Sequence, residues 1–239
     1  MTSTVISFCS LDARFLRHTV TQAGVFSDEV VVTYCDHLLD GTPEDMQAIS
    51  LFLTRICNQT SVNFRGVMTE WNADKPAKHW HNMIRWAGIQ ETKGDQLMLL
   101  DADEVPDGRK LLGILPMLDP TQAYAFGCYW YFRSACYQAE ETERCALLAP
   151  RNACTEDALF TSHERYGIDH KMVSDAVFHH YSWVHDLKET MRKVGSWAHK
   201  GDRRWEPEVA REWGRPFRGV DFVHGYRFRF VRPFVELGL

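Results

Sequence analysis

Short apolar runs alternate with longer mixed stretches along the first hundred residues. The runs TVISFCS, DEVVVTYC, VNFRGVM and QLMLLDA are rich in β-branched and aliphatic residues, as buried strands are, and each gap between them is long enough for a helix. Strands that alternate with helices predict parallel pairing, because parallel neighbours need a crossover connection. The pattern therefore predicts an α/β fold with a mostly parallel sheet flanked by helices.

Helical periodicity locates two long helices between these strands. Thr42 and Pro43 are typical of a cap followed by a first-turn proline, and apolar residues then recur at helical spacing. These apolar residues are Met46, Ile49, Leu53 and Ile56. A second helix is predicted over 74–92, with an apolar stripe on one face and Lys78, Asn82 and Arg85 on another. The stripe consists of Trp80, Ile84 and Ala87.

The second half of the chain is predicted to contain further strands and helices. GRKLLGILPML is typical of a short helix, and AYAFGCYWYF and ERCALLAPR are typical of strands. Asp186 followed by Glu189 predicts a helix that starts with a capping box. From Gly201 the periodicity weakens. We expect one domain over residues 1–200 and a carboxyl-terminal extension, residues 201–239, packed on it.

Composition adds limits on partners and location. The chain has 239 residues, 45% of them hydrophobic and 25% charged, as in ordinary globular proteins. No apolar run approaches the roughly 20 residues that cross a bilayer, so no transmembrane segment and a cytoplasmic location are expected. The seven cysteines include no C-x-x-C pair and are expected to be reduced. Residues 185–239 are basic, with 12 Lys and Arg against 8 Asp and Glu, but this excess is small, so no nucleic-acid partner is expected.

An acidic cluster follows the fourth predicted strand, in the stretch QLMLLDADEVPD. Ligands of open α/β sheets bind outside the carboxyl ends of the strands. In an extended segment Asp101 and Asp103 project to the same side, so both carboxylates are able to hold one divalent cation, which in turn binds a diphosphate. The alternative is that Asp103, Glu104 and Asp107 cap the following helix.

The spacing of these residues also bears on other cation and phosphate chemistries. A calcium loop of the EF-hand type requires glycine and glutamate where this chain has Pro106 and Leu112, so it is excluded. The histidines and cysteines do not have the spacing of a structural zinc site. LLDADEV is also compatible with a phosphatase of the haloacid dehalogenase type, with Asp101 as nucleophile, although three strand-and-helix units precede it here.

The order of these motifs resembles that of glycosyltransferases with the GT-A fold, particularly small family-two-like enzymes of the lipopolysaccharide-core type, over most of residues 3–200. VISFCSLDARFL resembles their first strand and nucleotide loop, which here contains Asp12, and VVVTYCD resembles their second strand, ending in Asp36. The resemblance implies that Asp36 contacts base or ribose. In KHWHNMIRWAGIQETKGDQLMLLDADEVP it implies donor contacts from Lys78, Asn82 and Asp101, although His81 replaces the usual arginine.

Two downstream segments extend the resemblance. LLAPRNACTEDALFTSHERYG and VFHHYSWVHDLKETMRKVGSW are similar to the family's segments with the catalytic base and the last metal ligand. The resemblance implies that Glu164 is the base, with Asp157 and Glu156 in reserve. It also implies that His180 completes a metal site with Asp101 and Asp103, although the adjacent His179 is an alternative. An imidazole among carboxylates favours Mn²⁺ over Mg²⁺.

Three basic residues are candidates for the donor phosphates: Arg151, Lys193 and Lys200, of which Lys193 matches the family's lysine. The aromatic residues Tyr129, Trp130 and Tyr131 are candidates for a wall that stacks on a sugar acceptor.

The function predicted from the sequence is a metal-dependent glycosyltransferase. It would move a sugar from a nucleotide-diphosphate-sugar donor to a hydroxyl of a saccharide acceptor, with inversion. The alternatives are the phosphatase and a non-catalytic carbohydrate-binding domain of the same fold.

Overall fold

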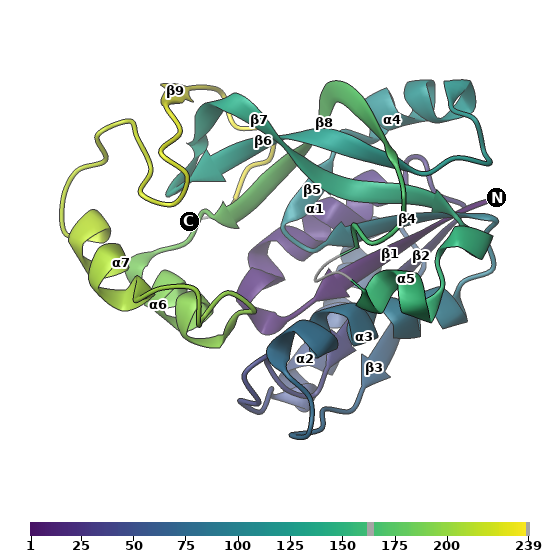
Figure 1. The fold of residues 1–239 in the computed structure, drawn as a ribbon, viewed down its shortest axis with the longest axis horizontal. Helices are drawn as coiled ribbons and strands as arrows, with labels where there is room; N and C mark the ends of the chain where they lie inside the picture. The colour runs from purple at the N-terminus through teal and green to yellow at the C-terminus, as the bar shows by residue number, and fades with distance from the viewer. Residues whose placement is uncertain (162–164, 238–239) are drawn as a thin grey trace.

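The computed structural model describes residues 1–161 and 165–237, without the side chains of residues 77 and 78. It consists of one sheet with helices packed on both of its faces (Figure 1). The strands are β1 (Thr2–Phe8), β2 (Glu29–Cys35), β3 (Phe64–Thr69), β4 (Gln96–Asp101), β5 (Glu104–Pro106), β6 (Tyr124–Phe132), β7 (Ser134–Pro150), β8 (Lys171–Trp183) and β9 (Phe228–Phe230). The helices are α1 (Ala13–Ala23), α2 (Met46–Thr60), α3 (Ala77–Glu91), α4 (Gly108–Ile114), α5 (Glu156–Phe160), α6 (Leu187–Ser196) and α7 (Trp205–Trp213), with 3₁₀ turns η1 (Ser10–Asp12), η2 (Leu115–Met117) and η3 (Arg151–Ala153).

The sheet has two halves that differ in strand direction. β3, β2, β1 and β4 are neighbours in that order and run parallel, as predicted. β7 then pairs antiparallel with β4, and the sheet continues through β6 and β8 to β5. The expected α/β fold with a Rossmann-like parallel half is confirmed. The other half is mixed rather than mostly parallel, because a tight turn at Arg133 reverses the chain between β6 and β7.

Strand alternation divides the core into two layers. Leu97 and Leu99 of β4 pack on the face covered by α3 and α5, together with Ile89. Met98 and Leu100 pack on the other face, against α1, α2 and α4. Since successive side chains of a strand point to opposite faces, the next residue, Asp101, is directed to the α3 side at the end of the strand.

Two of the predicted helix starts differ from those in the structure, and one is confirmed. α2 is capped by Asp45, whose side chain accepts a hydrogen bond from the Ala48 N–H at 2.9 Å, so Thr42 is not its cap. α3 likewise starts later than predicted. The predicted capping box of α6 is confirmed, because Asp186 and Glu189 each accept a hydrogen bond from the other's backbone N–H.

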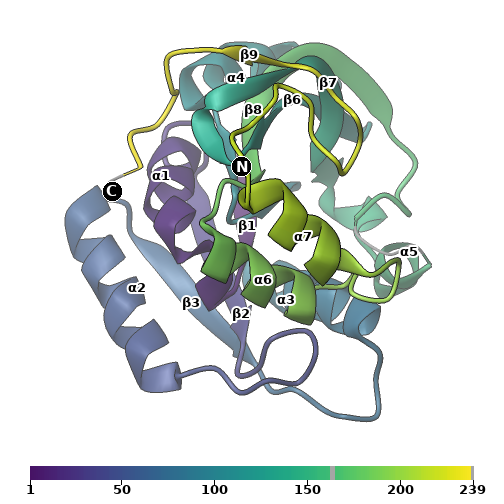
Figure 2. The same ribbon diagram turned by 90° about the vertical axis from the view of Figure 1, so that its left-hand side faces the viewer.

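Residues 201–239, which we call the tail, pack on the sheet. β9 extends the sheet by pairing with β7, and Figure 2 shows α7 lying beside α6. Trp205 and Val209 of α7 are buried in one cluster with Trp130, Phe132 and Trp183 of the sheet. The tail therefore supplies part of a hydrophobic core.

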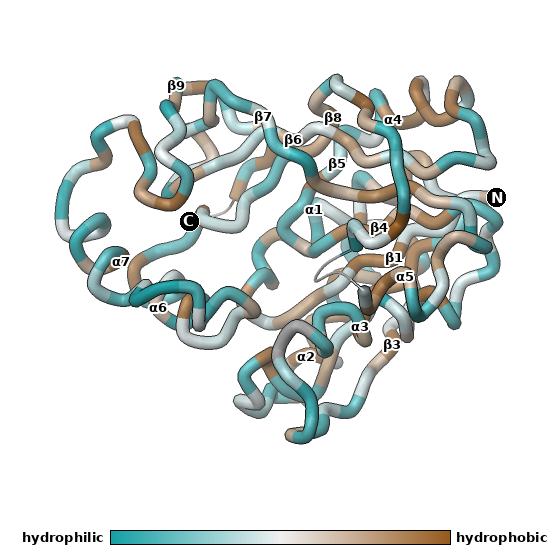
Figure 3. The backbone as a smooth tube through the Cα atoms, in the orientation of Figure 1, coloured by the Kyte–Doolittle hydropathy of each residue, from teal (hydrophilic) through white to brown (hydrophobic). Residues whose placement is uncertain are grey.

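Hydropathy and cysteine chemistry agree with this packing. In Figure 3 hydrophobic stretches follow the central strands, whereas α6 is largely hydrophilic. None of the helices in residues 1–161 and 165–237 is long and apolar enough to cross a membrane. All seven cysteines lie within the described residues as free thiols, four of them buried.

The packing of α7 predicts that the tail and the sheet unfold together. Trp205→Ala removes a side chain that is only 5% exposed and should lower the free energy of unfolding by about 3–5 kcal/mol, measured by urea denaturation. Glu206→Ala, at an exposed neighbouring position, should change it by less than about 0.5 kcal/mol. A separate early transition in the tryptophan variant, with the main transition unchanged, would show that the tail is an independent unit.

Candidate functional site

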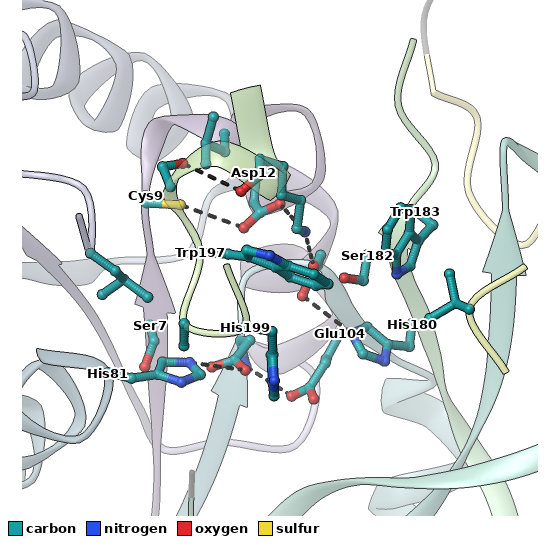
Figure 4. A pocket seen from close by; sticks show the side chains of 18 of the residues that line it. Ser7, Cys9, Asp12, His81, Glu104, His180, Ser182, Trp183, Trp197 and His199 are labelled. Atoms are coloured by element: carbon teal, nitrogen blue, oxygen red, sulfur yellow. Dashed lines mark hydrogen bonds and ion pairs between the residues drawn. The ribbon is translucent and has the colours of Figure 1, made fainter. Parts of the chain in front are cut away.

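A cavity of about 970 Å³, which we call the cleft, opens at the carboxyl ends of β1, β2 and β4. This is the edge at which open α/β sheets bind ligands. The cleft extends across β6 and β8 to the tail, so both halves of the sheet contribute to it. Figure 4 shows Asp12, Glu104 and His180 directed into this space from three different segments.

Asp101 is held by two buried arginines at one end of the cleft. The Arg85 guanidinium donates through one nitrogen to both Asp101 oxygens, at 2.7 and 2.9 Å, and Arg165 donates to Oδ2 at 3.3 Å. Arg85 is one helical turn before Ile89 on α3, on the face that packs against the sheet, which explains why it meets Asp101. Burial would raise the pKa of Asp101, but the charges of Arg85 and Arg165 lower it well below its ordinary value.

Glu104 shares Arg165 with Asp101. Its Oε1 accepts from the Arg165 guanidinium at 2.5 Å, and its Oε2 accepts from the backbone N–H of Asp101 at 2.8 Å. Burial raises the pKa of Glu104 to about 7, opposed by the charge of Arg165 and reinforced by that of Asp101. Glu104 is thus a buried group that links the end of β4 to the segment around Arg165.

Lys193 lies between two carboxylates at the other end of the acidic cluster. Its Nζ donates to Asp12 Oδ1 and to Asp103 Oδ2, both at 3.0 Å. Burial would lower the pKa of Lys193, but Asp103 and Asp12 raise it above its ordinary value, so the ammonium stays charged. Burial would raise the pKa of Asp12, but Lys193 and His185 lower it. The chain thus carries its own cation at this position.

His180 lies next to this pair. Its Nε2 is 3.7 Å from Asp103 Oδ1. Burial would lower the pKa of His180, but contact with the Cys128 thiol and the charges of Asp103 and Glu104 raise it to about 10. The adjacent His179 points away, with Nδ1 2.8 Å from the Tyr131 hydroxyl. Strand alternation therefore directs His180, and not His179, to the cleft.

The structure brings together five of the predicted site residues in the lining of the cleft: Asp12, Asp101, Asp103, His180 and Lys193. Two others lie close behind it. Asn82 is buried and accepts from Arg85 at 3.3 Å, so it supports the arginine. Asp36 accepts from the Trp71 N–H at 2.7 Å and lies between the lining residues Cys35 and His37.

Three predicted residues lie elsewhere. Arg151 was predicted to bind phosphate, but its guanidinium donates to the carbonyls of Gly94 and Ile89 and to the Thr92 hydroxyl. β7 runs antiparallel to β4, so its last residues, just before Arg151, meet the start of β4 at the opposite edge of the sheet. The prediction for Arg151 is therefore wrong.

Lys200 and Asp157 are not part of the cleft lining either. Lys200 is exposed, with Nζ 3.7 Å from Asp40. Asp157 is exposed in the first turn of α5, next to Glu156. Glu164, the predicted base, and the side chain of Lys78 lie outside the described residues.

Several residues that line or support the cleft were not predicted as site residues. Arg85 was recognised only as sharing a helix face with Asn82, although its spacing from Ile89 already places it against the sheet. No sequence pattern indicates that Arg165 lies next to Asp101. Of the predicted aromatic wall only Trp130 lines the cleft, because Tyr129 and Tyr131 point to the other side of β6. Further rings come from residues distant in sequence: Trp183, Trp197, Trp205 and Tyr226.

The predicted metal ligands do not share one cation position. Asp101 ends β4 and the chain turns at Ala102, so the i, i+2 rule for strands does not extend to Asp103. Asp101 is bound by two guanidiniums, whereas Asp103 is bound by Lys193. Within the described residues, no group of three or more His, Cys, Asp and Glu side chains is positioned to hold a metal ion. In this arrangement the residues do not fit the expected Mn²⁺ or Mg²⁺.

Comparisons with known proteins find similarity in solved structures only. No family model and no curated protein sequence matches the chain. It is similar to residues 1–349 of S. aureus TarS in complex with UDP-GlcNAc (12% identity, 89% of this chain and 71% of that one, TM-score 0.47). It is also similar to the glycosyltransferase GlyE of Streptococcus pneumoniae (12% identity, 73% and 46%, TM-score 0.40) and to a nucleotidyl transferase from Methanothermobacter (15% identity, 66% and 75%, TM-score 0.38).

Because two buried arginines pair with Asp101, neutralising Asp101 is predicted to lower the free energy of unfolding strongly. Asp101→Asn leaves Arg85 and Arg165, whose side chains are 0% and 2% exposed, without that countercharge. Removing one partner of a buried pair costs about 3–5 kcal/mol, and we expect the lower end because Asp101 is itself 22% exposed. Lys110→Ala, which removes an exposed lysine from its pair with the partly exposed Asp107, should cost less than about 1 kcal/mol. Chemical denaturation measures the loss of unfolding free energy in both variants. Equal losses would contradict the electrostatic role of Asp101.

Proposed function

We propose that the protein is a glycosyltransferase that moves a sugar from a nucleotide-diphosphate donor to a hydroxyl acceptor. The observation that carries this proposal is the cleft at the carboxyl ends of the parallel strands, where a buried ammonium and two aspartates face the space. Such an edge binds nucleotides in open α/β sheets. Cations in a site of this kind stabilise the charge that develops on a leaving diphosphate.

The end of the cleft near β2 suits the nucleoside of the donor. Cys35, His37, Leu38 and Leu39 line it with apolar and ring surface, and Asp36 lies at the strand end between them. A carboxylate at the end of a strand is suited to accept hydrogen bonds from ribose hydroxyls. The diphosphate would then lie toward Lys193, since the β1–α1 loop contacts Glu44, which follows β2, through Ser10 and contacts Lys193 through Asp12.

The aromatic end of the cleft suits a saccharide acceptor. Trp130, Trp183, Trp197 and Trp205 line it with ring surface. A sugar presents apolar faces that pack on aromatic rings, and its hydroxyl groups pair with the polar groups that lie among such rings. This end therefore supports binding of a sugar rather than of a purely apolar molecule.

The chemistry requires a base on the acceptor side. The acceptor oxygen forms a bond to the anomeric carbon as the bond from that carbon to the diphosphate oxygen breaks. The hydroxyl proton passes to a carboxylate, and the nucleotide diphosphate leaves. Attack from the face opposite the leaving group inverts the configuration. Glu164 remains our candidate for the base, from its motif.

The phosphatase alternative is disfavoured by the contacts of Asp101. A nucleophilic aspartate needs an oxygen free to attack phosphorus, whereas both Asp101 oxygens accept from Arg85 and one also accepts from Arg165. A non-catalytic carbohydrate-binding domain would have the same aromatic end but would not need the Lys193 cluster.

The proposal is tested by a binding and turnover screen. Thermal shifts and calorimetry with UDP, GDP and TDP should reveal one preferred nucleotide. Nucleotide-sugars of that base, including UDP-GlcNAc, which the TarS structure contains, should then release nucleotide diphosphate in the presence of a saccharide acceptor. Saturable glycan binding with no nucleotide binding would favour the non-catalytic alternative, and phosphate release from simple esters would favour the phosphatase.

Removal of the proposed base gives a separate test. Glu164→Gln should lower kcat by about 100-fold or more, because general bases contribute about 10²–10⁴-fold, while the Kd for the nucleotide stays within about twofold. Asp169→Asn, at an exposed position nearby, is the control. Unchanged kcat in the glutamine variant, with loss of turnover in Asp157→Asn, would transfer the role to Asp157.

A further inference from the structure

The acidic cluster of the cleft is neutralised from within the chain. Asp101 is bound by Arg85 and Arg165, and Asp12 and Asp103 share Lys193. Convergent carboxylates repel one another unless cations compensate them. Here each of the three aspartates already has a cationic partner within 3.0 Å. A divalent ion at this position would be repelled by the positive charges of those partners.

The residues around Lys193 hold its side chain in place, so it differs from a solvent-exposed lysine that forms an ion pair at the surface. Its side chain is 11% exposed, and it projects from α6, which is docked on the loop between β1 and α1. Two further polar contacts fix this docking: Arg14 donates to Glu189 at 2.5 Å, and Arg192 donates to the Ser10 hydroxyl at 3.1 Å. The position of the ammonium is thus set by the helix as a whole.

The ammonium also has a donor to offer to a ligand. A lysine ammonium has three N–H bonds, and in the described part of the chain two of them are directed to Asp12 and Asp103. Lys193 belongs to the lining of the cleft, so we expect the third to reach a ligand there. A phosphate oxygen is a strong acceptor for such a charged donor.

We propose that Lys193 takes the part of the divalent cation, so that the diphosphate of the donor binds through this ammonium and without a metal ion. This inference rests on the proposed function, because it concerns the same donor. It differs from the expectation drawn from the D-x-D motif, in which a metal ion joins Asp101 and Asp103 to the diphosphate. Here the aspartates orient a lysine.

The first experiment uses the unmodified protein. The Kd of the preferred nucleotide diphosphate is measured by calorimetry in EDTA. It is measured again without EDTA, in the presence of excess Mn²⁺ or Mg²⁺. We expect values within about threefold of each other. Tightening by tenfold or more with either ion would overturn the inference and leave the proposed function intact. Absence of binding of every nucleotide under both conditions would overturn the inference and the proposed function together.

The second experiment exchanges the cation. In Lys193→Ala, Asp12 and Asp103 lose their shared partner, so the variant should bind the nucleotide at least tenfold more weakly in EDTA, and Mn²⁺ should restore part of the loss. Mn²⁺ alone, titrated by calorimetry, should bind to this variant more tightly than to the unmodified protein. Nucleotide affinity in EDTA equal to that of the unmodified protein would overturn the inference.

Two further variants control for misfolding and for effects of removing any lysine from α6. Lys193→Arg keeps the positive charge and should bind the nucleotide in EDTA within about fivefold of the unmodified protein, even if the alanine variant folds poorly. Lys188→Ala, at an exposed position of the same helix, should leave nucleotide and Mn²⁺ binding unchanged. Loss of binding in the arginine variant, with an unchanged melting temperature, would also count against a role of the charge.

Discussion

The compensation of carboxylates at the carboxyl ends of β1 and β4 is the constraint on which the site depends. Four acidic groups meet there, and their cations come from three different segments: Arg85 from α3, Arg165 from the segment before β8, and Lys193 from α6. Buried charges are tolerated only when they are paired and hydrogen-bonded. The paired charges therefore fix how α3, α6 and the segment at Arg165 sit relative to the sheet, and so they fix the shape of the cleft.

The two ends of the cleft are built by different forces. The end near β1 and β4 is organised by ion pairs, as the polar docking of α6 shows. The aromatic end is organised by hydrophobic packing, since Trp183 and Trp205 belong to a core cluster as well as to the lining. This arrangement suits a protein that binds an anionic molecule at one end and a sugar at the other. Because Trp205 belongs to both sets, the tail contributes to the core and to the lining of the cleft.

The sequence predicted what depends on local pattern. The unbroken apolar run in QLMLLDA predicted a buried strand that ends at Asp101, and the capping residues Asp186 and Glu189 predicted α6. The motif resemblance pointed to Asp12, Asp103, His180 and Lys193, all of which line the cleft. What could not be predicted is the pairing, because Lys193 and Asp12 are 181 positions apart and their contact is created by the fold. Arg151 was misassigned for the same reason, since its charge alone does not reveal which edge of the sheet it joins.

The D-x-D pattern illustrates why a motif does not by itself define the cation that it serves. The pattern fixes two carboxylates near the end of a strand, but the turn at Ala102 separates their directions, and the neighbours then decide what each one binds. Asp101 meets guanidiniums because α3 lies on its face of the sheet, whereas Asp103 meets an ammonium because α6 lies above the β1–α1 loop. Arginine keeps its charge in proteins, and the neighbouring Asp103 and Asp12 raise the pKa of Lys193 above its ordinary value. A carboxylate that these cations hold keeps its geometry without an ion from solution, and it is this geometry that a bound diphosphate would meet.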